Sequence, residues 1–550
     1  MAEMENNSSR IMNNTRFFQI VLVIIPVVFL VSSILTHSYF GYFYQRITDP
    51  DYFHLLNGIN IALFNLATPY VDHPGTPLQI IVAISSWPVS LFFPGSISNN
   101  VIDHPEIFLT AAIITMNIII ALVMYFAGRK VMRYSNDIWL TMIIQLMPFG
   151  NIYALNVFGR LTPESFMIVP IMLMAVFLIR FIYDDSLEKL SNKQLLYLAM
   201  IGGMGMAIKF SYLPFLLLPI FVIRRFPQLL KYGIYSIGFT FLFAFPLIFN
   251  LSKSISWFGN MLINTGHWGE GSSGFMVWSE IPDKLWLLVN VNQWFAVLLL
   301  TVIFLTLFST IMGKNTPKIN RLNLISAGII LSIAFSMFLI TKHFAYRYYF
   351  PTLLFQVILI YLIVEYARRL FQLHKIVRYL SFIAFTIFFI TILIQVPKFE
   401  KKIKQMSAEH KLYSERSKEL VKVTQRDIPI IIDAHYAGSP FPEFALNNAY
   451  LLCGNLKTTF QEKLRAEYPK SFFYVSWSDQ FFHWNHFWDS NVFINTEEGL
   501  FVFIGENKLK DLDIIIERLE KSFPKYEVDC RLLLGFENPG ENLYQVTFIP

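Results

Sequence analysis

Hydrophobic runs about twenty residues long recur along this chain, and they constrain its fold more than any other feature. A run of that length crosses the apolar core of a bilayer when it forms a helix. In the whole chain of 550 residues, 55% are hydrophobic, 15% are charged, and the mean hydropathy is +0.48. This composition excludes a soluble domain of that size and predicts a polytopic α-helical membrane protein.

We predict about eleven transmembrane helices from these runs. The first run, 17–40, precedes no small-residue cleavage site, so we interpret it as a retained helix and not as a secretory signal. An apolar run at 78–93 is interpreted as a helix that lies along the membrane or dips into it, because a span there would reverse every later loop. The other predicted spans lie near residues 107–127, 138–157, 164–181, 195–208, 212–223, 232–250, 286–311, 323–341, 350–366 and 376–396.

The basic residues give the predicted helices an orientation. If the N-terminus is cytoplasmic, the loops that carry most of the Lys and Arg residues all fall on the cytoplasmic side, as the positive-inside rule requires. These loops contain Arg129, Arg180, Arg224, Lys314 and Arg368. We therefore predict a cytoplasmic tail at 1–16, a transmembrane module at 17–397 and an extracytoplasmic domain at 398–550. The pI of about 8.9 follows from this topology and requires no nucleic acid partner.

The last 150 residues or so differ in composition and predict a small α/β domain. The stretch 401–426 is charged and typical of a helix. Short strands are predicted at 428–432, 471–475, 500–504 and 526–534. Cys453 and Cys530 are the only cysteines, and outside the cytoplasm they either form a disulfide or remain buried thiols.

Acidic residues gather in the predicted outer loops. The first loop holds Asp49 and Asp51, followed by Asp72 and His73. A membrane protein does not need carboxylates at this position in order to fold, so the loop is a candidate site. In the second loop, Glu164 opens a predicted helix, where an acid that complements the helix dipole explains the residue as well as a functional role does.

Basic and aromatic residues occur in the remaining outer loops. Lys209 is a lone charge between two apolar runs, and Lys342, Arg347 and Tyr348 belong to an aromatic segment before a predicted helix. Snorkelling of the cations or an interfacial anchor belt would also explain these residues.

A glycine-rich loop supplies His267 and Glu270 as further candidates for a substrate loop, although such a loop can also be flexible without a function. Asp72, His73 and His267 could join two loops through a metal ion.

Acidic and basic loops on one face fit the transfer of a group from an anionic lipid carrier. A carboxylate can deprotonate an acceptor hydroxyl or bind a divalent metal such as Mg or Mn, and Arg or Lys can stabilise a phosphate leaving group.

The chain also resembles the GT-C superfamily of membrane glycosyltransferases, in particular protein O-mannosyltransferases and lipid A aminoarabinose transferases. The resemblance covers roughly residues 15–400. It rests on an acidic motif, a His-Pro motif with an inserted Gly-Thr, an acid that opens a span, a lysine after a glycine-rich span and an Arg-Tyr motif. In this sequence they are Asp49-Pro50-Asp51-Tyr52, His73 to Leu78, Glu164, Lys209 and Arg347 to Pro351.

The resemblance implies a GT-C-like fold and an inverting transfer of a sugar from a polyprenyl phosphate. Asp49 or Asp51 would be the general base on the acceptor hydroxyl. Glu164 would be the second acid, which orients the acceptor or shares a metal with the two aspartates. The implied phosphate-binding residues are Lys209, Lys342, Arg347 and Tyr348.

Other functions stay open at this point. A transporter or lipid flippase would share the hydropathy, and a polysaccharide polymerase or ligase would use the same donors. A non-enzymatic assembly factor is a further alternative. The acceptor could be a lipid, a glycan or a protein. The short loops favour a bacterial inner membrane, with the C-terminal domain in the periplasm or outside the cell.

Overall fold

The computed structural model describes two compact units within the chain. The described residues are 2–46, 49–70, 75–151, 157–184, 190–265, 271–313, 316–342, 344–371, 377–424, 428–433, 438–476, 479–484, 486–487, 499–506, 508–536 and 540–550. Unit 1 comprises 1–37, 71–78 and 113–402, and unit 2 comprises 38–70, 79–112 and 403–550.

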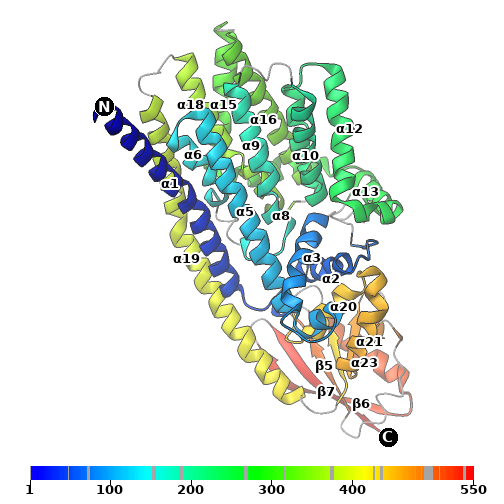
Figure 1. Cartoon of the computed structure of the whole chain (residues 1–550). Helices are drawn as coiled ribbons and strands as arrows, with labels where there is room; N and C mark the ends of the chain where they lie inside the picture. The colour runs from blue at the N-terminus through cyan, green and yellow to red at the C-terminus, as the bar shows by residue number, and fades with distance from the viewer. Residues whose placement is uncertain are drawn as a thin grey trace. The chain divides into compact units, whose positions relative to one another are not determined.

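Helices make up most of the described residues, and their labels follow Figure 1. The helices are α1 (Ala2–Phe40), α2 (Asp51–Ala62), α3 (Thr76–Ser90), α4 (Ile97–Asp103), α5 (Pro105–Ser135), α6 (Ile138–Gln145), α8 (Pro163–Phe166), α9 (Ile168–Tyr183), α10 (Asn192–Ile208), α11 (Leu213–Leu216), α12 (Phe226–Phe243), α13 (Leu251–Ile263), α14 (Ile281–Val291), α15 (Gln293–Ile311), α16 (Pro317–Lys342), α17 (Tyr346–Leu353), α18 (Gln356–Leu370), α19 (Val377–Thr424), α20 (Pro442–Tyr450), α21 (Lys457–Glu467) and α23 (Leu509–Ser522).

Seven helical segments among the described residues are long and apolar enough to cross a membrane. They are Gln19–Phe40, Pro105–Ser135, Pro163–Tyr183, Gln293–Ile311, Pro317–Lys342, Tyr346–Leu370 and Arg378–Thr424. An eighth arises if Phe226–Phe243 and Phe245–Ile263, which meet at 88°, form one broken span. These helices agree with the prediction of an integral membrane protein.

The prediction of eleven spans is too high for the described residues. The run at 138–157 yields only the eight residues of α6 before a 3₁₀ turn that contains Pro148, and α10 has 17 residues. The run at 212–223 divides into α11 and a 3₁₀ helix, with Pro214 and Pro219 in their first turns. Proline lacks the N–H that continues a helix, so a hydropathy count overestimates spans where prolines interrupt an apolar run.

Two kinds of apolar helix occur in unit 1. The apolar windows of Pro163–Tyr183 and Tyr346–Leu370 are both 89% buried, whereas those of Gln293–Ile311 and Arg378–Thr424 are 22% and 11% buried. Exposed apolar helices of this kind are the surface that lipid covers. The first pair therefore forms the protein core, and the second pair presents side chains outward.

Glycines bring α10 and α12 together, and the two helices lie side by side in Figure 1. A Cβ atom on Gly203 would lie 2.5 Å from the Phe239 side chain and 2.7 Å from the Thr240 backbone nitrogen. No larger residue fits there without a shift of one helix. The close approach also fixes the end of α10, where Lys209 follows.

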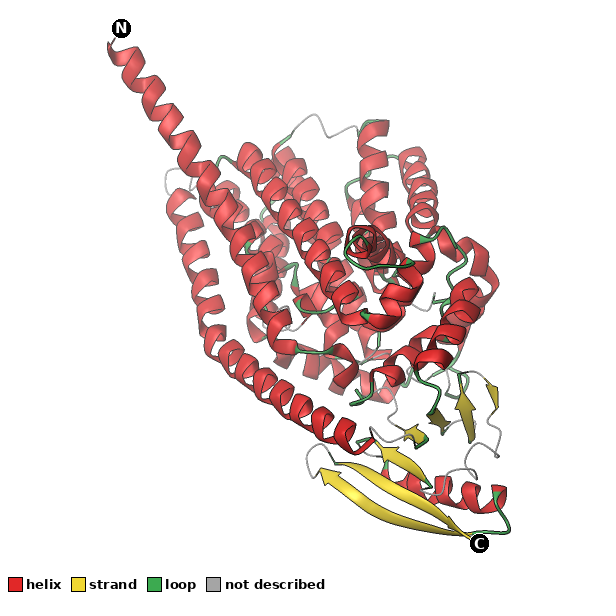
Figure 2. Cartoon of the chain, turned by 60° about the horizontal axis from the view of Figure 1, so that its bottom comes forward, coloured by secondary structure: helices red, strands yellow, loops and turns green. Residues whose placement is uncertain are grey.

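The C-terminal part of unit 2 contains a seven-stranded sheet in the order β4-β3-β2-β1-β5-β7-β6. The strands are β1 (Ile430–Asp433), β2 (Ser471–Val475), β3 (Gln480–His483), β4 (His486–Phe487), β5 (Leu500–Ile504), β6 (Glu527–Phe536) and β7 (Glu541–Ile549). Strands β2, β1 and β5 are parallel, and the other pairs are antiparallel. Figure 2 shows β6 and β7 as the long hairpin in yellow.

The four predicted strands are confirmed as β1, β2, β5 and β6, and the predicted helix at 401–426 is confirmed as the end of α19. Strands β3, β4 and β7 were not predicted. Helix α23 packs Ile515 and Leu519 into the core that the sheet forms. Cys453 and Cys530 are both free thiols, and burial raises the pKa of Cys453 to about 12.

Unit 2 also contains most of the first loop. Asp103 of α4 forms an ion pair with Lys463 of α21 at 2.8 Å, and the Asn60 amide donates a hydrogen bond to the Cys453 carbonyl. Gly58 lies against Val82, where a Cβ would come within 2.4 Å. The sequence predicted the C-terminal domain but not that first-loop helices belong to the same unit.

Glu443 gives unit 2 a testable pH dependence. It lies in the first turn of α20 at 6% exposure and accepts a hydrogen bond from Ser471 Oγ at 3.1 Å. Burial raises its pKa to about 7, above the value in an unfolded chain. The contribution of protonated Glu443 to the free energy of unfolding is therefore fully present below about pH 4.3. It amounts to about 3 kcal/mol and is lost as pH rises through 7.

We expect the thermal unfolding midpoint of the purified protein to depend less on pH in Glu443→Gln than in the wild type. Glutamine keeps the hydrogen bond but does not titrate. Glu462→Gln, at an exposed position on α21, serves as the control and should follow the wild type. Identical pH profiles for all three proteins would contradict the assignment.

Candidate functional site

A buried ion pair joins two helix ends in unit 1. Glu164 lies in the first turn of α8, and Lys209 directly follows α10. The Lys209 Nζ atom lies 2.5 Å from Glu164 Oε1, and the two side chains are 5% and 6% exposed. Charges this deeply buried require a partner, and here each compensates the other.

Local sequence explains why both residues stand at helix ends. Pro163 suits the first turn of a helix because its fixed φ is helical and no N–H is needed there, and an acid beside it complements the helix dipole. At the other end, Gly205 leaves room for the Tyr212 ring, since a Cβ would lie 2.4 Å from it. The chain therefore leaves α10 at Lys209, whose backbone is extended.

Two further predicted residues surround the ion pair. Lys209 Nζ lies 4.3 Å from the centroid of the Tyr348 ring, and the Arg347 guanidinium carbon lies 5.1 Å from the same ring. Arg347 also donates a hydrogen bond to the Tyr348 hydroxyl at 3.2 Å. Tyr348 is buried and Arg347 is exposed, so a cationic rim surrounds one aromatic ring.

A cavity of about 160 Å³ opens beside this ring. Lys209, Lys342 and Tyr348 contribute to its wall, together with Ser211. Most of the remaining wall is apolar and comes from α13 and α16. These apolar residues include Trp257, Phe258, Met261, Leu262, Leu339 and Ile340.

Lys342 differs from Lys209 in its surroundings. Its Nζ lies 4.3 Å from the Phe275 ring centroid, is itself buried, and has no hydrogen-bond partner among the residues that the structure describes. The Ser211 hydroxyl is likewise without a partner within those residues. Buried polar groups without partners are costly, so their presence at a cavity favours an anionic ligand there.

The two first-loop aspartates belong to unit 2 and differ in burial. Asp51 lies in the first turn of α2 and is 0% exposed, whereas Asp49 is half-buried. Tyr70 donates a hydrogen bond to Asp49 Oδ1 at 3.2 Å. A general base must reach its acceptor, so the exposure favours Asp49 over Asp51.

Glu106 is a half-buried acid that the sequence analysis did not identify. Its Oε1 accepts hydrogen bonds from the Tyr44 backbone N–H at 3.2 Å and from the Tyr52 hydroxyl at 2.9 Å. Burial and this carboxylate raise the pKa of Tyr44 to about 12. The sequence does contain a signal for this residue. Glu106 follows Pro105 at the start of a helix in the same way that Glu164 follows Pro163.

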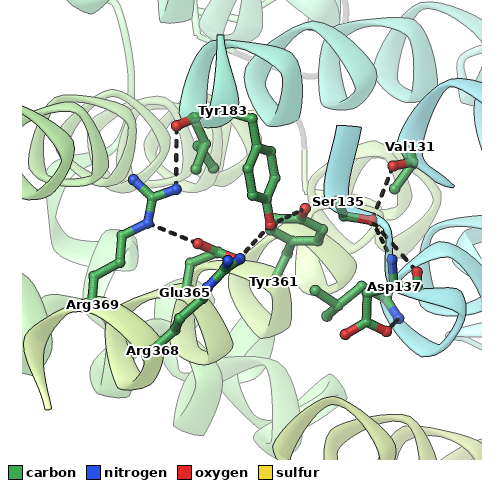
Figure 3. Close-up of polar contacts among 10 residues, drawn as sticks. Val131, Ser135, Asp137, Tyr183, Tyr361, Glu365, Arg368 and Arg369 are labelled. Atoms are coloured by element: carbon green, nitrogen blue, oxygen red, sulfur yellow. Dashed lines mark hydrogen bonds and ion pairs between the residues drawn. The ribbon is translucent and has the colours of Figure 1, made fainter. Parts of the chain in front are cut away.

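Figure 3 shows a second group of buried charges in unit 1, at the ends of α9 and α18. Glu365 is 0% exposed and accepts from Arg369 Nε at 2.9 Å and Arg368 at 3.4 Å. The Tyr183 hydroxyl donates to the same carboxylate, and Tyr361 donates to Tyr183 at 2.9 Å. The sequence analysis treats Arg368 only as a loop charge. The structure pairs it and Arg369 with Glu365 of the same helix, and the Tyr183 hydroxyl connects this group to α9.

The remaining predicted residues give no further geometry. Asp72, His73, His267 and Glu270 lie outside the described residues. Within the described part, no group of three or more His, Cys, Asp and Glu side chains could hold a metal. Asp49 and Asp51 belong to one unit and Glu164 to the other, so a metal site formed by these three stays a prediction.

No protein family, curated protein or solved structure matches this chain. The interpretation of the site therefore rests on its own geometry.

The buried ion pair gives a testable stability difference. In Glu164→Gln, the Lys209 charge would remain buried without its counter-charge, and we expect the free energy of unfolding to fall by about 3–5 kcal/mol. The measurement is the unfolding transition of the purified protein in one detergent, and Lys209→Met in the Glu164→Gln background should recover part of the loss.

Glu280→Gln is the matched control. Glu280 forms an ion pair with Lys284 at 2.7 Å but is 53% exposed, so its loss should cost at most about 1 kcal/mol. Equal effects of the two single substitutions would mean that burial does not strengthen the Glu164 pair.

Proposed function

We propose that this protein is a glycosyltransferase that moves a sugar from a polyprenyl-phosphate carrier to an acceptor hydroxyl at the outer face of a membrane. The observation that carries the proposal is the Lys342 ammonium, which lies without a hydrogen-bond partner among the described residues at a mostly apolar cavity. A ligand with an anionic head and an apolar chain complements both features.

The phosphate of the donor would lie near the cationic part of the cavity. Lys342 is the cation available for direct contact, and Arg347 would add charge from the rim. The charge of Lys209 is already paired with Glu164, so its effect on a phosphate is reduced. The apolar side chains of Trp257 and Leu339 would contact the first isoprene units. Cations at this position stabilise the charge that develops on the leaving phosphate.

Asp49 is the proposed general base. It would take the proton of the acceptor hydroxyl while that oxygen attacks the anomeric carbon and the lipid phosphate leaves, which inverts the configuration. The hydrogen bond from Tyr70 orients this carboxylate. Glu164 acts as a positioning residue, because Lys209 engages its buried carboxylate.

The proposed location is a bacterial inner membrane, with a cytoplasmic N-terminus and the C-terminal sheet domain on the outer side. The support is the alternation of basic loops in the sequence. The acceptor is a lipid, glycan or protein hydroxyl, and a polysaccharide polymerase or ligase would differ from this proposal only in the size of what it transfers.

A lipid flippase is the second candidate, because a cavity with one unpaired cation could also bind a lipid phosphate without any chemistry. The two proposals differ in whether the donor is consumed, and the next two tests separate them.

Asp49→Asn should lower the turnover of a polyprenyl-phosphate sugar by about 100- to 10,000-fold, because a positioned general base contributes a factor of that order. Donor binding should be unchanged. The measurement is the release of labelled sugar from the carrier in membranes that contain each variant. Asp51→Asn, two residues away and fully buried, should keep turnover per folded molecule. Wild-type turnover in Asp49→Asn would refute the assignment, and no donor consumption by the wild type would favour the flippase.

Lys342→Met should weaken donor binding by about 10- to 100-fold, since a hydrogen bond to a charged group contributes about 1.5–3 kcal/mol. The measurement is the affinity of the purified protein for a non-hydrolysable polyprenyl-phosphate analogue. Lys342→Arg keeps the charge and should retain most of the binding, and Lys318→Met, at an exposed position in α16, should behave like the wild type. An unchanged affinity in Lys342→Met would remove the cavity from the proposal.

A further inference from the structure

A second concave region in unit 1 lies between α5, α9 and the start of α10, and encloses about 460 Å³. We call it the basic groove. It has three cations in its wall, Lys130, Arg180 and Lys193, and two aromatic residues, Tyr134 and Tyr197. None of these residues belongs to the cavity of the proposed donor site.

Among the described residues, two of the three cations of the basic groove have no acidic partner. Arg180 forms an ion pair with Asp184 at 3.1 Å and lies 5.9 Å from the Tyr134 ring centroid. Lys130 and Lys193 are exposed, and neither forms an ion pair with an acid in the part of the chain that the structure describes. Within the described residues, the groove therefore carries a positive excess that an anion would compensate.

The remaining wall of the basic groove is of two kinds. Ser191 and Gln194 are already engaged, because they form the capping box of α10. Val176 and Phe177 also contribute to the wall but are only 8% and 3% exposed, so the accessible apolar surface beside the cations is mainly the ring of Tyr197, which is 36% exposed. A basic rim beside an amphipathic ring fits the interfacial headgroup region of an amphiphile.

The groove lies at the opposite end of α9 and α10 from the proposed donor site. Lys193 is in the first turn of α10 and Lys209 directly follows its last residue, so about 25 Å of helix separates them. Likewise, Glu164 precedes α9 whereas Arg180 is in its last turn. One site thus belongs to each end of the same helices.

We propose that the basic groove binds the phosphate headgroup of an anionic phospholipid in the cytoplasmic leaflet. The proposal rests on the membrane orientation given under the proposed function but not on the transfer reaction. Anionic lipids are enriched in that leaflet, and each basic residue near such a surface adds attraction. The tyrosines lie at headgroup depth, where their amphipathic rings are favourable, and the Tyr197 ring contacts the start of the acyl chains.

The test is the binding of short-chain phosphatidylglycerol to the purified full-length protein in a neutral detergent, followed by the shift of its thermal unfolding. Lys130→Gln combined with Lys193→Gln should weaken binding by about 30-fold, which corresponds to about 1 kcal/mol for each lysine. Lys130→Arg combined with Lys193→Arg keeps both charges and should bind like the wild type. The matched control is Arg224→Gln combined with Lys318→Gln, at exposed positions outside the groove, and should also bind like the wild type.

Two other ligands distinguish binding of an anionic lipid from binding of a neutral lipid or of free phosphate. Phosphatidylcholine with the same chains should bind much more weakly, and inorganic phosphate should not displace phosphatidylglycerol. Equal binding to wild type and the Gln pair, equal binding of the two lipids, or displacement by inorganic phosphate would each overturn the proposal. This experiment measures lipid binding and not sugar transfer, so the two proposals can fail independently. A protein without transferase activity can still bind the lipid, and a transferase can lack the groove site.

Discussion

Buried charge in apolar surroundings must be compensated, and this constraint organises unit 1. Glu164 and Lys209 satisfy it with an ion pair of 2.5 Å between the start of one helix and the end of another. Glu365 satisfies it with Arg368 and Arg369 of the same helix, α18. The first pair joins two helix ends directly, and the second group is connected to α9 through the Tyr183 hydroxyl. The Lys342 ammonium, which has no hydrogen-bond partner among the described residues, is the exception to this pattern.

The proposed phosphate site combines a fixed part and an available part. The Glu164–Lys209 pair sets the backbone geometry around Tyr348, whose ring both Lys209 and Arg347 contact. Lys342 then supplies charge that no described protein group uses. In the proposed site, the charges that stabilise the fold and the charge that would contact the ligand belong to different residues. Ligand binding would therefore not require the structural ion pair to break.

The first-loop aspartates depend on parts of the chain that are far away in sequence. Helix α2, which begins with Asp51, belongs to the same unit as the C-terminal sheet, and Asn60 donates to the Cys453 carbonyl. A buried ion pair between Arg416 and Glu541, at 2.8 Å, connects the end of α19 to β7 in that unit. The C-terminal domain thus supports the loop that carries the proposed base, and substitutions in the sheet can affect chemistry through this support.

The sequence by itself determined the membrane class, four of the strands and the residues to consider, because apolar runs, alternating strands and helix-starting prolines are local patterns. Only the tertiary structure decided that Glu164 pairs with Lys209 from another helix, that Asp51 is buried while Asp49 keeps exposed surface, and that Lys342 Nζ has no hydrogen-bond partner among the described residues. It also reduced the number of spans where prolines interrupt apolar runs. Burial and pairing depend on contacts between residues far apart in the chain, and no local pattern encodes them.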